Sequence, residues 1–426
     1  MEQKLHTPEG VRDIYSTECR KKLTIQEKLH HLLHLYGYQD IQTPTFEYFD
    51  VFRDEIGTIS SRELYKFFDR DGDTLALRPD ITPSIARAAA TLFEEEEFPA
   101  RLCYIGNTFI NHSSYQGRLK ENTQLGAELI GEDSVEADAE LIAMVVDSLK
   151  KVGLKEFQVN IGHVDFLHTL MDLTGLNEEK KAEVYALTAN RNYFGVEEIL
   201  IRENVEMSVV EMFRILPELT GGTEALVRAA KLVPGETAKR AIVRLLKIYQ
   251  ILELYGAEAY VTFDLSMSGS YGYYSGIVFR AYTYGTGDAI VRGGRYDHLI
   301  AKFGKNTPSI GFAVIIDELL SALGRQKIEI ETGHCNLIVY TDATLNWAVS
   351  LACDLREKGK CIELLKREPW QERAVYEEYG KRRGTDSLTY LKDDRSMEMV
   401  NLKTGETRVI RSESDTGSDT GSEETR

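Results

Sequence analysis

The chain has 426 residues, with 51 basic and 68 acidic side chains and a formal net charge of −17. This length is too great for one compact core, so we expect two or three domains. The acidic balance argues against a nucleic-acid partner, because phosphate binding draws on clustered lysine and arginine. No apolar run approaches the roughly 20 residues of a membrane span, and the N-terminus lacks a signal-peptide pattern. We therefore expect a cytoplasmic protein without membrane contact.

The first predicted element is a helix from Thr17 to about Leu35, where leucines recur at helical spacing in a charged segment. His30, His31 and His34 lie on it. Histidines four residues apart are able to share a metal ion, but the sequence shows no third ligand, so we expect helix-surface residues and no metal site. The five cysteines form no C-x-x-C pair, which predicts free thiols and no structural zinc: Cys19, Cys103, Cys335, Cys353 and Cys361.

The segment DTLALRPDITPSIARAAATLF (residues 73–93) predicts a strand that runs into a helix. We expect Thr82 to be the N-cap and Pro83 to occupy the first helical position. Asp80 and Thr82 would then lie at a helix N-terminus. Either they cap the helix and complement its dipole, or they bind a ligand.

A long hairpin is predicted next, with RLCYIGNTFI as its first strand, NHSSYQGRLKEN as a polar loop and TQLGAELIG (residues 123–131) as the returning strand. Side chains alternate along a strand, so Gln124, Gly126 and Glu128 share one face, and apolar residues occupy the other. The glycine leaves room for a close approach to the backbone. This face is either solvated, with a bulge, or the floor of a small polar pocket.

The rest of the chain divides into further modules. A helix (residues 138–153) and a strand (157–163) precede a helical insertion from about 164 to 258. Strands resume at AYVTFDLS, YYSGIVFRAYT and DAIVRGG, and SIGFAVIIDELLSAL runs from strand to helix. These elements define a first domain over residues 1–325. After the linker GRQKIEIETGH, residues 335–410 predict a small α/β domain, and the Ser/Thr/Gly/acid-rich residues 411–426 predict a disordered acidic tail.

Several pieces of this sequence resemble, in order and wording, the histidyl-tRNA synthetases, a class II aminoacyl-tRNA synthetase family: LRPDITPS, YIGNTF…YQGRLKENTQLGAELIG, GYYSGIVF, GGRYDHL and SIGFAVIIDEL. The resemblance covers roughly residues 5–325 and reaches the last domain only loosely. It implies an α+β fold with an antiparallel sheet flanked by helices, a helical insertion and a small C-terminal α/β domain.

The resemblance also implies a histidine pocket lined by six residues: Asp80, Thr82, Gln124, Glu128, Tyr274 and Tyr296. The first three would hold the α-amino end, Glu128 and Tyr274 would hydrogen-bond the imidazole, and Tyr296 would line the wall. An imidazole offers N–H donors to a carboxylate and a phenol, and an ammonium prefers carboxylates and other acceptors. Seen alone, each tyrosine is equally compatible with a place in the core.

The positions that bind ATP in the synthetase differ here. The hairpin arginine and the glutamate two residues later, which contact the α-phosphate and the adenine, correspond to Ile110 and His112. The arginine before the paired tyrosines corresponds to Gly269, and the one that closes the strand-to-helix motif corresponds to Glu318. Because removing one electrostatic donor typically costs about 10²–10³ in rate, the loss of three cations argues against amino-acid activation.

Two consequences of these differences stay open. The weaker alternative is that a neighbouring basic residue takes over one phosphate contact: Arg118, Lys120 or Arg295. Gly269 also removes a guanidinium that the synthetase offers to the amino-acid carboxylate, so histidine would bind weakly or meet a different cation.

A synthetase-like chain that keeps the histidine pocket and lacks the ATP residues resembles the regulatory subunits of ATP phosphoribosyltransferase. This implies an allosteric, non-catalytic protein without a cofactor, in a hetero-oligomer with the short-form catalytic subunit. It would activate the first step of histidine biosynthesis and relay feedback inhibition by L-histidine. Self-association as a dimer or larger is expected through residues 36–53. The alternatives are a divergent histidyl-tRNA synthetase, a ligase for another amino acid or protein, and a free-standing histidine-binding module.

Overall fold

The structure is a computed structural model that describes residues 6–53, 60–94, 98–112, 118–267, 273–333 and 335–411. Gly269 and the predicted tail, apart from Arg411, lie outside the described residues. The chain forms two compact units, one of Met1–Asp13 with Lys22–Ile330 and the other of Ile14–Lys21 with Glu331–Arg426. Within the described ranges, no helix combines the length and apolar character that a membrane crossing requires.

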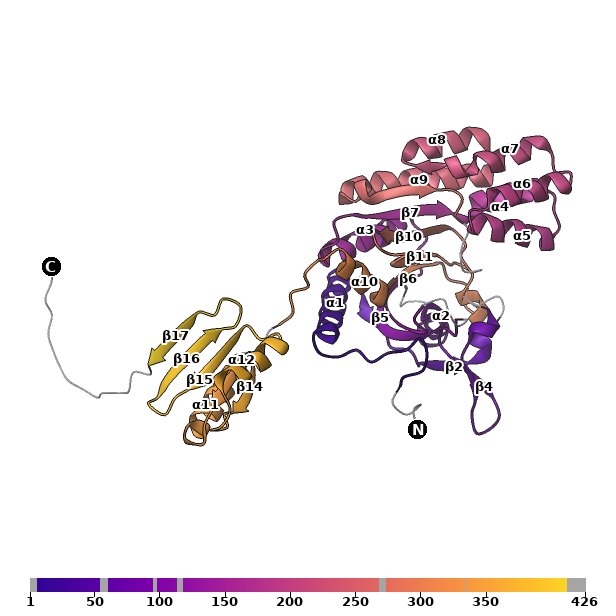
Figure 1. Ribbon diagram of the computed structural model, residues 1–426. Helices are drawn as coiled ribbons and strands as arrows, with labels where there is room; N and C mark the ends of the chain where they lie inside the picture. Colours follow the sequence, from indigo (N-terminus) through magenta and orange to yellow (C-terminus); the bar gives the residue numbers. More distant parts are fainter. Residues whose placement is uncertain are drawn as a thin grey trace, which may run out of the picture. The chain divides into compact units, whose positions relative to one another are not determined.

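A nine-stranded sheet forms the centre of the larger unit, as far as the structure describes it (Figure 1). Its spatial order is β1 (Gln39–Asp40), β5 (Ala100–Phe109), β6 (Glu121–Ile130), β12 (Ser309–Ile315), β11 (Val291–Arg295), β10 (Ile277–Thr283), β7 (Phe157–His163), β9 (Val261–Asp264) and β8 (Thr220–Gly221). The pairs β1 with β5 and β7 with β9 are parallel, and the other neighbours are antiparallel. The sheet is thus mixed, with an antiparallel centre.

Four helices follow or precede these strands: α1 (Ser16–Leu35), of which residues 22–35 belong to the larger unit, α2 (Thr82–Leu92), α3 (Val135–Lys151) and α10 (Ile316–Arg325). The predicted N-terminal helix is confirmed, and it buries residues at helical spacing, among them Ile25, Leu29 and Leu33. Helix α3 begins where the Ser134 side chain accepts a hydrogen bond from the Ala137 N–H, which satisfies one of the free donors at a helix start. Helices α1, α3 and α10 pack their apolar faces into one extended core, whereas α2 packs into a second cluster through Ile85, Ala86 and Ala89.

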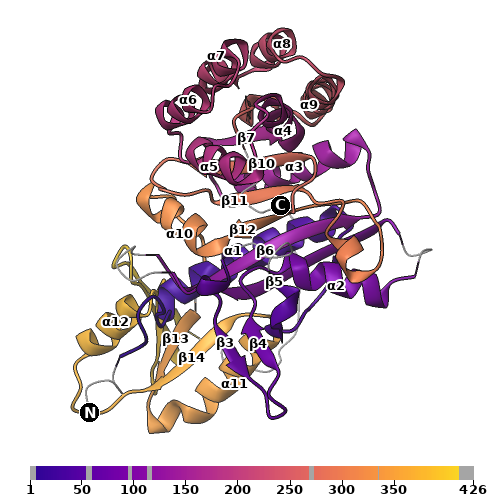
Figure 2. The same cartoon turned by 90° about the vertical axis from the view of Figure 1, so that its right-hand side faces the viewer.

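The predicted helical insertion contains α4 (Val164–Leu173), α5 (Glu178–Ala189), α6 (Tyr193–Arg202), α7 (Met207–Ile215), α8 (Thr223–Leu232) and α9 (Glu236–Tyr255). These helices lie together beyond β7 (Figures 1 and 2). The prediction of helices alone was wrong at one point, since Thr220–Gly221 forms the short strand β8 against β9. Gly221 has a φ of 142°, which other residues rarely adopt, so the chain leaves the helical pattern there.

A small separate sheet contains β2 (Phe46–Tyr48), β4 (Thr74–Leu77) and β3 (Lys66–Phe68). Elsewhere in the chain, short 3-10 helices occur at η2 (Phe49–Val51), η4 (Ser61–Glu63), η6 (Leu216–Glu218), η7 (Glu258–Tyr260), η8 (Ile300–Phe303) and η9 (Asp342–Thr344).

Four aromatic side chains on β2 and β3 of the small sheet are exposed, and we call them the aromatic patch: Phe46, Tyr48, Phe67 and Phe68. Large exposed aromatic groups at this density are typical of an association surface.

The second unit has a five-stranded sheet in the order β14 (Cys361–Lys366), β13 (Cys335–Tyr340), β15 (Ser387–Leu391), β16 (Ser396–Asn401) and β17 (Thr407–Arg411). Its helices are α11 (Leu345–Glu357) and α12 (Arg373–Arg382). Strand β13 pairs in parallel with β14 and β15. Leu337 and Val339 pack into one apolar cluster and Ile338 into another, because both faces of a parallel strand are covered.

The start of α2 corrects one prediction. The helix begins at Thr82 itself, with Ile81 at the N-cap position, and no side chain caps it there. Pro83 therefore lies in the first turn but at the second helical position, one residue later than predicted. The Thr82 hydroxyl donates instead to Glu128 Oε1 at 2.8 Å, so it faces a residue on β6 and not its own helix. Asp80 Oδ1 accepts from the Ile81 N–H at 2.9 Å.

Candidate functional site

A cavity of about 140 Å³ lies on one face of the central sheet, bounded by the β5–β6 hairpin, β11, β12 and the start of α2. All six residues predicted to bind histidine line it: Asp80, Thr82, Gln124, Glu128, Tyr274 and Tyr296. Three of the positions that differ from the synthetase's ATP residues line the same cavity: Ile110, His112 and Glu318. Residues from distant parts of the chain therefore meet as the sequence predicted, except Gly269, which the structure does not describe.

Glu128 forms the floor of this cavity. Its side chain accepts hydrogen bonds from Thr82 Oγ1 at 2.8 Å and from the Tyr296 hydroxyl at 2.6 Å. Only 1% of the residue is exposed, and burial raises the pKa of the carboxyl group to about 8. Burial therefore favours the neutral, protonated form of this carboxyl group, while the two hydroxyl donors favour its charged form. Gly311 pairs with Glu128 across the sheet, and any Cβ at that position would overlap Glu128 Oε2.

Gly126 has a different role from the one that the sequence left open. A Cβ at this position would clash with the Phe312 carbonyl oxygen and lie 2.5 Å from the Tyr104 hydroxyl. The space beside the glycine is thus filled by the protein itself. Strand β6 pairs without interruption with β5 from Glu121 to Ile130, so the alternative of a solvated strand face with a bulge is excluded.

The end of the pocket that is predicted to hold the α-amino group of histidine contains hydrogen-bond acceptors. Asp80 is 5% exposed, burial raises the pKa of its carboxyl group, and Oδ2 accepts from the Tyr273 hydroxyl at 3.1 Å. The Oε1 atom of Gln124 is buried and has no hydrogen-bond partner in the part of the chain that the structure describes. A buried acceptor without a partner costs free energy, so it favours a donor supplied by a ligand or water. Tyr273 was not predicted, although it adjoins Tyr274 in the sequence.

Arg292 is the second residue of the cavity that the sequence analysis missed. It lines the cavity together with Arg118, and both contact Asp288, Arg292 Nη2 at 2.8 Å and Arg118 Nη2 at 3.6 Å. Arg292 pairs with Ala313 on β12, and Ala313 pairs with Gly126 on β6. The residue directly across from Arg292 on β12 is thus a small one, Ala313. Strand alternation in VRGGR could have predicted Arg292, because Arg292 and Gly294 lie on the same face of the strand.

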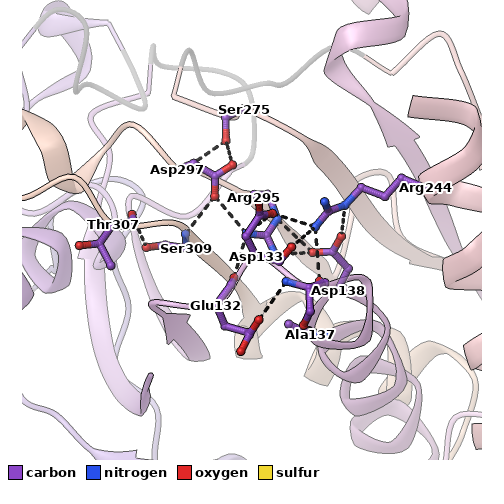
Figure 3. A network of polar contacts seen from close by, with 11 residues as sticks. Glu132, Asp133, Ala137, Asp138, Arg244, Ser275, Arg295, Asp297, Thr307 and Ser309 are labelled. Atoms are coloured by element: carbon purple, nitrogen blue, oxygen red, sulfur yellow. Dashed lines mark hydrogen bonds and ion pairs between the residues drawn. The ribbon is translucent and has the colours of Figure 1, made fainter. Parts of the chain in front are cut away.

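Arg295, named in the weaker alternative as a residue that takes over one phosphate contact, binds other residues. Its guanidinium is 2% exposed and lies behind the cavity in a polar network (Figure 3). It donates to Asp138 Oδ1 at 2.6 and 3.1 Å and to Asp297 Oδ1 at 3.0 Å. Asp138 also accepts from Arg244 Nε at 2.6 Å. Arg295 therefore fixes the chain next to Tyr296 and is not available to a phosphate group in the cavity.

Comparison with known proteins gives a consistent result. The family model of histidyl-tRNA synthetase matches residues 10–319. The ATP phosphoribosyltransferase regulatory subunit of Acetivibrio thermocellus is 38% identical over 410 residues, which cover 96% of this chain and 98% of that protein. The protein of the same name from Ruminiclostridium cellulolyticum is 35% identical over 94% of this chain and 95% of its own length.

Solved structures share this architecture. A Bacillus halodurans structure titled ATP phosphoribosyltransferase regulatory subunit/histidyl-tRNA synthetase has a TM-score of 0.80 and 33% identity, covering 90% of this chain and 97% of that chain. Histidyl-tRNA synthetase from Nostoc sp. PCC 7120 has a TM-score of 0.81 over 95% and 96% of the two chains. At 18% identity, this second likeness concerns the fold alone. The predicted class II synthetase-like fold is confirmed.

Proposed function

The chain belongs to the family of ATP phosphoribosyltransferase regulatory subunits, which have the fold of histidyl-tRNA synthetases, and we propose that it is a non-catalytic histidine sensor within that enzyme. It would bind the short-form catalytic subunit, support the condensation of ATP with phosphoribosyl pyrophosphate, and transmit feedback inhibition by L-histidine. The observation that carries this proposal is a single cavity. It contains the six residues expected for histidine, while Ile110 and Glu318 occupy places where the synthetase has phosphate-binding arginines.

The cavity suits each part of histidine. The α-ammonium would donate to Asp80 and to Gln124 Oε1, which has no partner among the described residues. The imidazole would meet Glu128 and Tyr274, and the Glu128 proton held by burial is available to the imidazole. Charge-assisted hydrogen bonds of this kind are roughly twice as strong as neutral ones. Inhibition then follows if histidine binds more tightly to the inactive conformation of the complex than to the active one.

Arg292 is the candidate partner of the histidine carboxylate. We expect Arg292→Ala to weaken histidine binding by about 1–1.5 kcal/mol, roughly fivefold to tenfold. The effect is modest because solvent screens the Arg292 side chain, which is 29% exposed and also forms an ion pair with Asp288. Isothermal titration of the full chain with histidine measures this. Arg280→Ala is the matched control, because Arg280 lies directly across from Arg292 on β10 but outside the cavity lining. Equal affinities in the two variants would contradict the assignment.

Reconstitution tests the proposed function. The chain is purified with and without the short-form catalytic subunit, and formation of phosphoribosyl-ATP is measured. We expect activity to depend on both chains and to fall when histidine is added. Activity of the catalytic subunit alone at the level of the mixture would overturn the proposal.

The rival function, a divergent histidyl-tRNA synthetase, makes an opposite prediction. A synthetase must exchange pyrophosphate with ATP in the presence of histidine. We expect no such exchange, because Glu318 places a negative charge at the cavity where the synthetase has a cation. Histidine-dependent exchange by the isolated chain would favour the rival.

We also propose that the chain self-associates through the aromatic patch on β2 and β3, part of which falls within residues 36–53. Phe46 is 50% exposed, Tyr48 is 59% exposed, and Phe68 is 74% exposed. We expect sedimentation velocity to show a dimer or larger species, and Phe46→Glu to raise the dissociation constant by about tenfold or more. Phe194→Glu is the control, since Phe194 is 80% exposed on α6. A wild-type monomer at all concentrations would contradict this.

A further inference from the structure

A cluster of four potential metal ligands lies on the opposite face of the sheet from the histidine cavity. His30 and His34 come from α1, Asp40 from β1 and Cys103 from β5. One ligand atom from each, a nitrogen, an oxygen or a sulfur, lies within 4.8 Å of all the others. The four ligands thus come from three elements that the fold brings together, and they include more than one kind of donor.

The arrangement follows from backbone geometry. His30 and His34 are four residues apart on α1, so both side chains lie on one face, with ring centroids 4.3 Å apart. Asp40 pairs with Cys103 in the parallel ladder of β1 and β5. The Asp40 carboxylate lies within hydrogen-bond distance of Nε2 of both histidines, with His34 Nε2 at 3.1 Å, and accepts a hydrogen bond from Cys103 Sγ at 3.6 Å. Asp40 is therefore at the centre of the cluster.

From this geometry we propose that His30, His34, Asp40 and Cys103 form a binding site for a zinc-class divalent cation. Zinc binds nitrogen at 2.0–2.1 Å, oxygen at 2.0–2.2 Å and sulfur at about 2.3 Å in a tetrahedron, which places ligand atoms about 3.3–3.7 Å apart. The four ligand atoms lie within 4.8 Å of one another, a spacing of the same order. A nitrogen, oxygen and sulfur donor set suits Zn²⁺ or Co²⁺ better than Mg²⁺ or Ca²⁺, which prefer oxygen.

The alternative is an ordinary pair of histidine–aspartate contacts on the surface. Two features favour a metal instead. Both histidines present Nε2 to the same carboxylate, and a fully buried thiol faces that carboxylate from the sheet. The Asp40 side chain is 60% exposed, so an ion has access from solvent, while Cys103 anchors it to the core.

Such a site would join α1 to the sheet behind the cavity floor. Cys103 pairs with Ala127, and the neighbouring residue Tyr104 pairs with Gly126 on the cavity face. A bound ion would thus stabilise β5, which pairs along its length with β6, the strand that carries Gln124 and Glu128. The site does not depend on the proposed function, since its ligands are separate from the cavity lining.

Metal binding to the full chain tests the proposal. After treatment with a chelator, the chain is dialysed against ZnCl₂, and bound zinc is measured by atomic absorption. We expect one zinc per chain and an affinity about 100-fold lower or worse in His34→Gln, because losing even an outer-sphere partner of a metal ligand costs 10–100-fold. His31→Gln is the matched control, being an exposed histidine on the same helix outside the cluster.

A second probe tests the thiol. With CoCl₂ we expect a thiolate-to-cobalt charge-transfer band that is present in wild type, His31→Gln and Glu128→Gln and absent in Cys103→Ser. Because Cys103 is buried and its variant is at risk of misfolding, the exposed His34→Gln variant decides the case if Cys103→Ser does not fold. Equal zinc binding by His34→Gln and His31→Gln, or no stoichiometric zinc in wild type, would overturn the proposal.

Discussion

Glu128→Gln is expected to leave the reconstituted enzyme active and to shift its histidine inhibition curve to higher concentration by about 10–150-fold. The substitution removes a charge-assisted hydrogen bond to the imidazole, whose loss costs about 1.5–3 kcal/mol, and each 1.4 kcal/mol is tenfold in affinity. Glutamine has nearly the size of the protonated carboxyl group that burial favours, so the fold should tolerate it. Glu128→Ala should shift the curve as well, but it also leaves a cavity and two hydroxyls without their acceptor.

The matched control is Glu121→Gln. Glu121 lies at the start of the same strand, outside the cavity lining, and accepts a hydrogen bond from Asn107. It should leave the inhibition curve unchanged. Tyr274→Phe should shift the curve in the same direction as Glu128→Gln but less, since it removes a neutral acceptor of an imidazole N–H. An unchanged curve in Glu128→Gln would mean that histidine acts elsewhere and that the cavity is an inherited remnant.

The same contact predicts a pH profile for histidine binding. In the complex, one proton is shared between the imidazole and Glu128. Below a pH of about 6.5, free histidine carries a second proton that must leave, so affinity falls as pH decreases. Above the Glu128 pKa of about 8, binding must take up a proton, so affinity falls by up to about tenfold per pH unit. Glu128→Gln should lose most of this alkaline decline, which separates it from titration of the histidine amino group.

Strand alternation alone predicted which side of β6 faces the site, because a period of two needs no knowledge of distant residues. Gln124 and Glu128 do share the cavity face. The assignment of Thr82 as a helix cap was wrong, because capping preferences depend only on neighbouring residues. The group that accepts the hydrogen bond of the Thr82 hydroxyl is Glu128, which lies 46 residues further along the chain. Helix caps and distant acceptors compete for the same hydroxyl, and only the fold decides between them.

The metal-ligand cluster shows the same limit. The spacing of His30 and His34 was visible in the sequence, but Cys103 is 63 residues from Asp40 and reaches it through the pairing of β1 with β5. A two-residue strand such as β1 has too few residues for a period-of-two pattern. Arg292 was missed for a different reason. It precedes the two glycines of VRGGR, and the motif that carries the resemblance, GGRYDHL, contains Arg295 and not Arg292.

Asp138→Ala is expected to destabilise the larger unit by about 3–5 kcal/mol, the cost of breaking a buried ion pair by removing one partner. Asp138 is fully buried and contacts Arg295 and Arg244, each at 2.6 Å (Figure 3). Its loss would leave the Arg295 guanidinium, 2% exposed, with Asp297 at 3.0 Å and the exposed Asp133 at 3.4 Å. Because Arg295 precedes Tyr296, histidine binding should weaken along with stability.

The measurement needs a probe of the correct unit. Both tryptophans, Trp347 and Trp370, belong to the second unit, so their fluorescence identifies its unfolding in urea, and the remaining change in far-ultraviolet circular dichroism reports the larger unit. Asp133→Ala is the control, since that side chain is 63% exposed and its pair with Arg244 contributes about 0–1 kcal/mol. Asp138→Asn keeps an acceptor and should cost less than Asp138→Ala. If Asp138→Ala and Asp133→Ala unfold at the same urea concentration, the contacts of Asp138 do not hold this face of the sheet together, and Arg295 must be stabilised by its other contacts, such as Asp297.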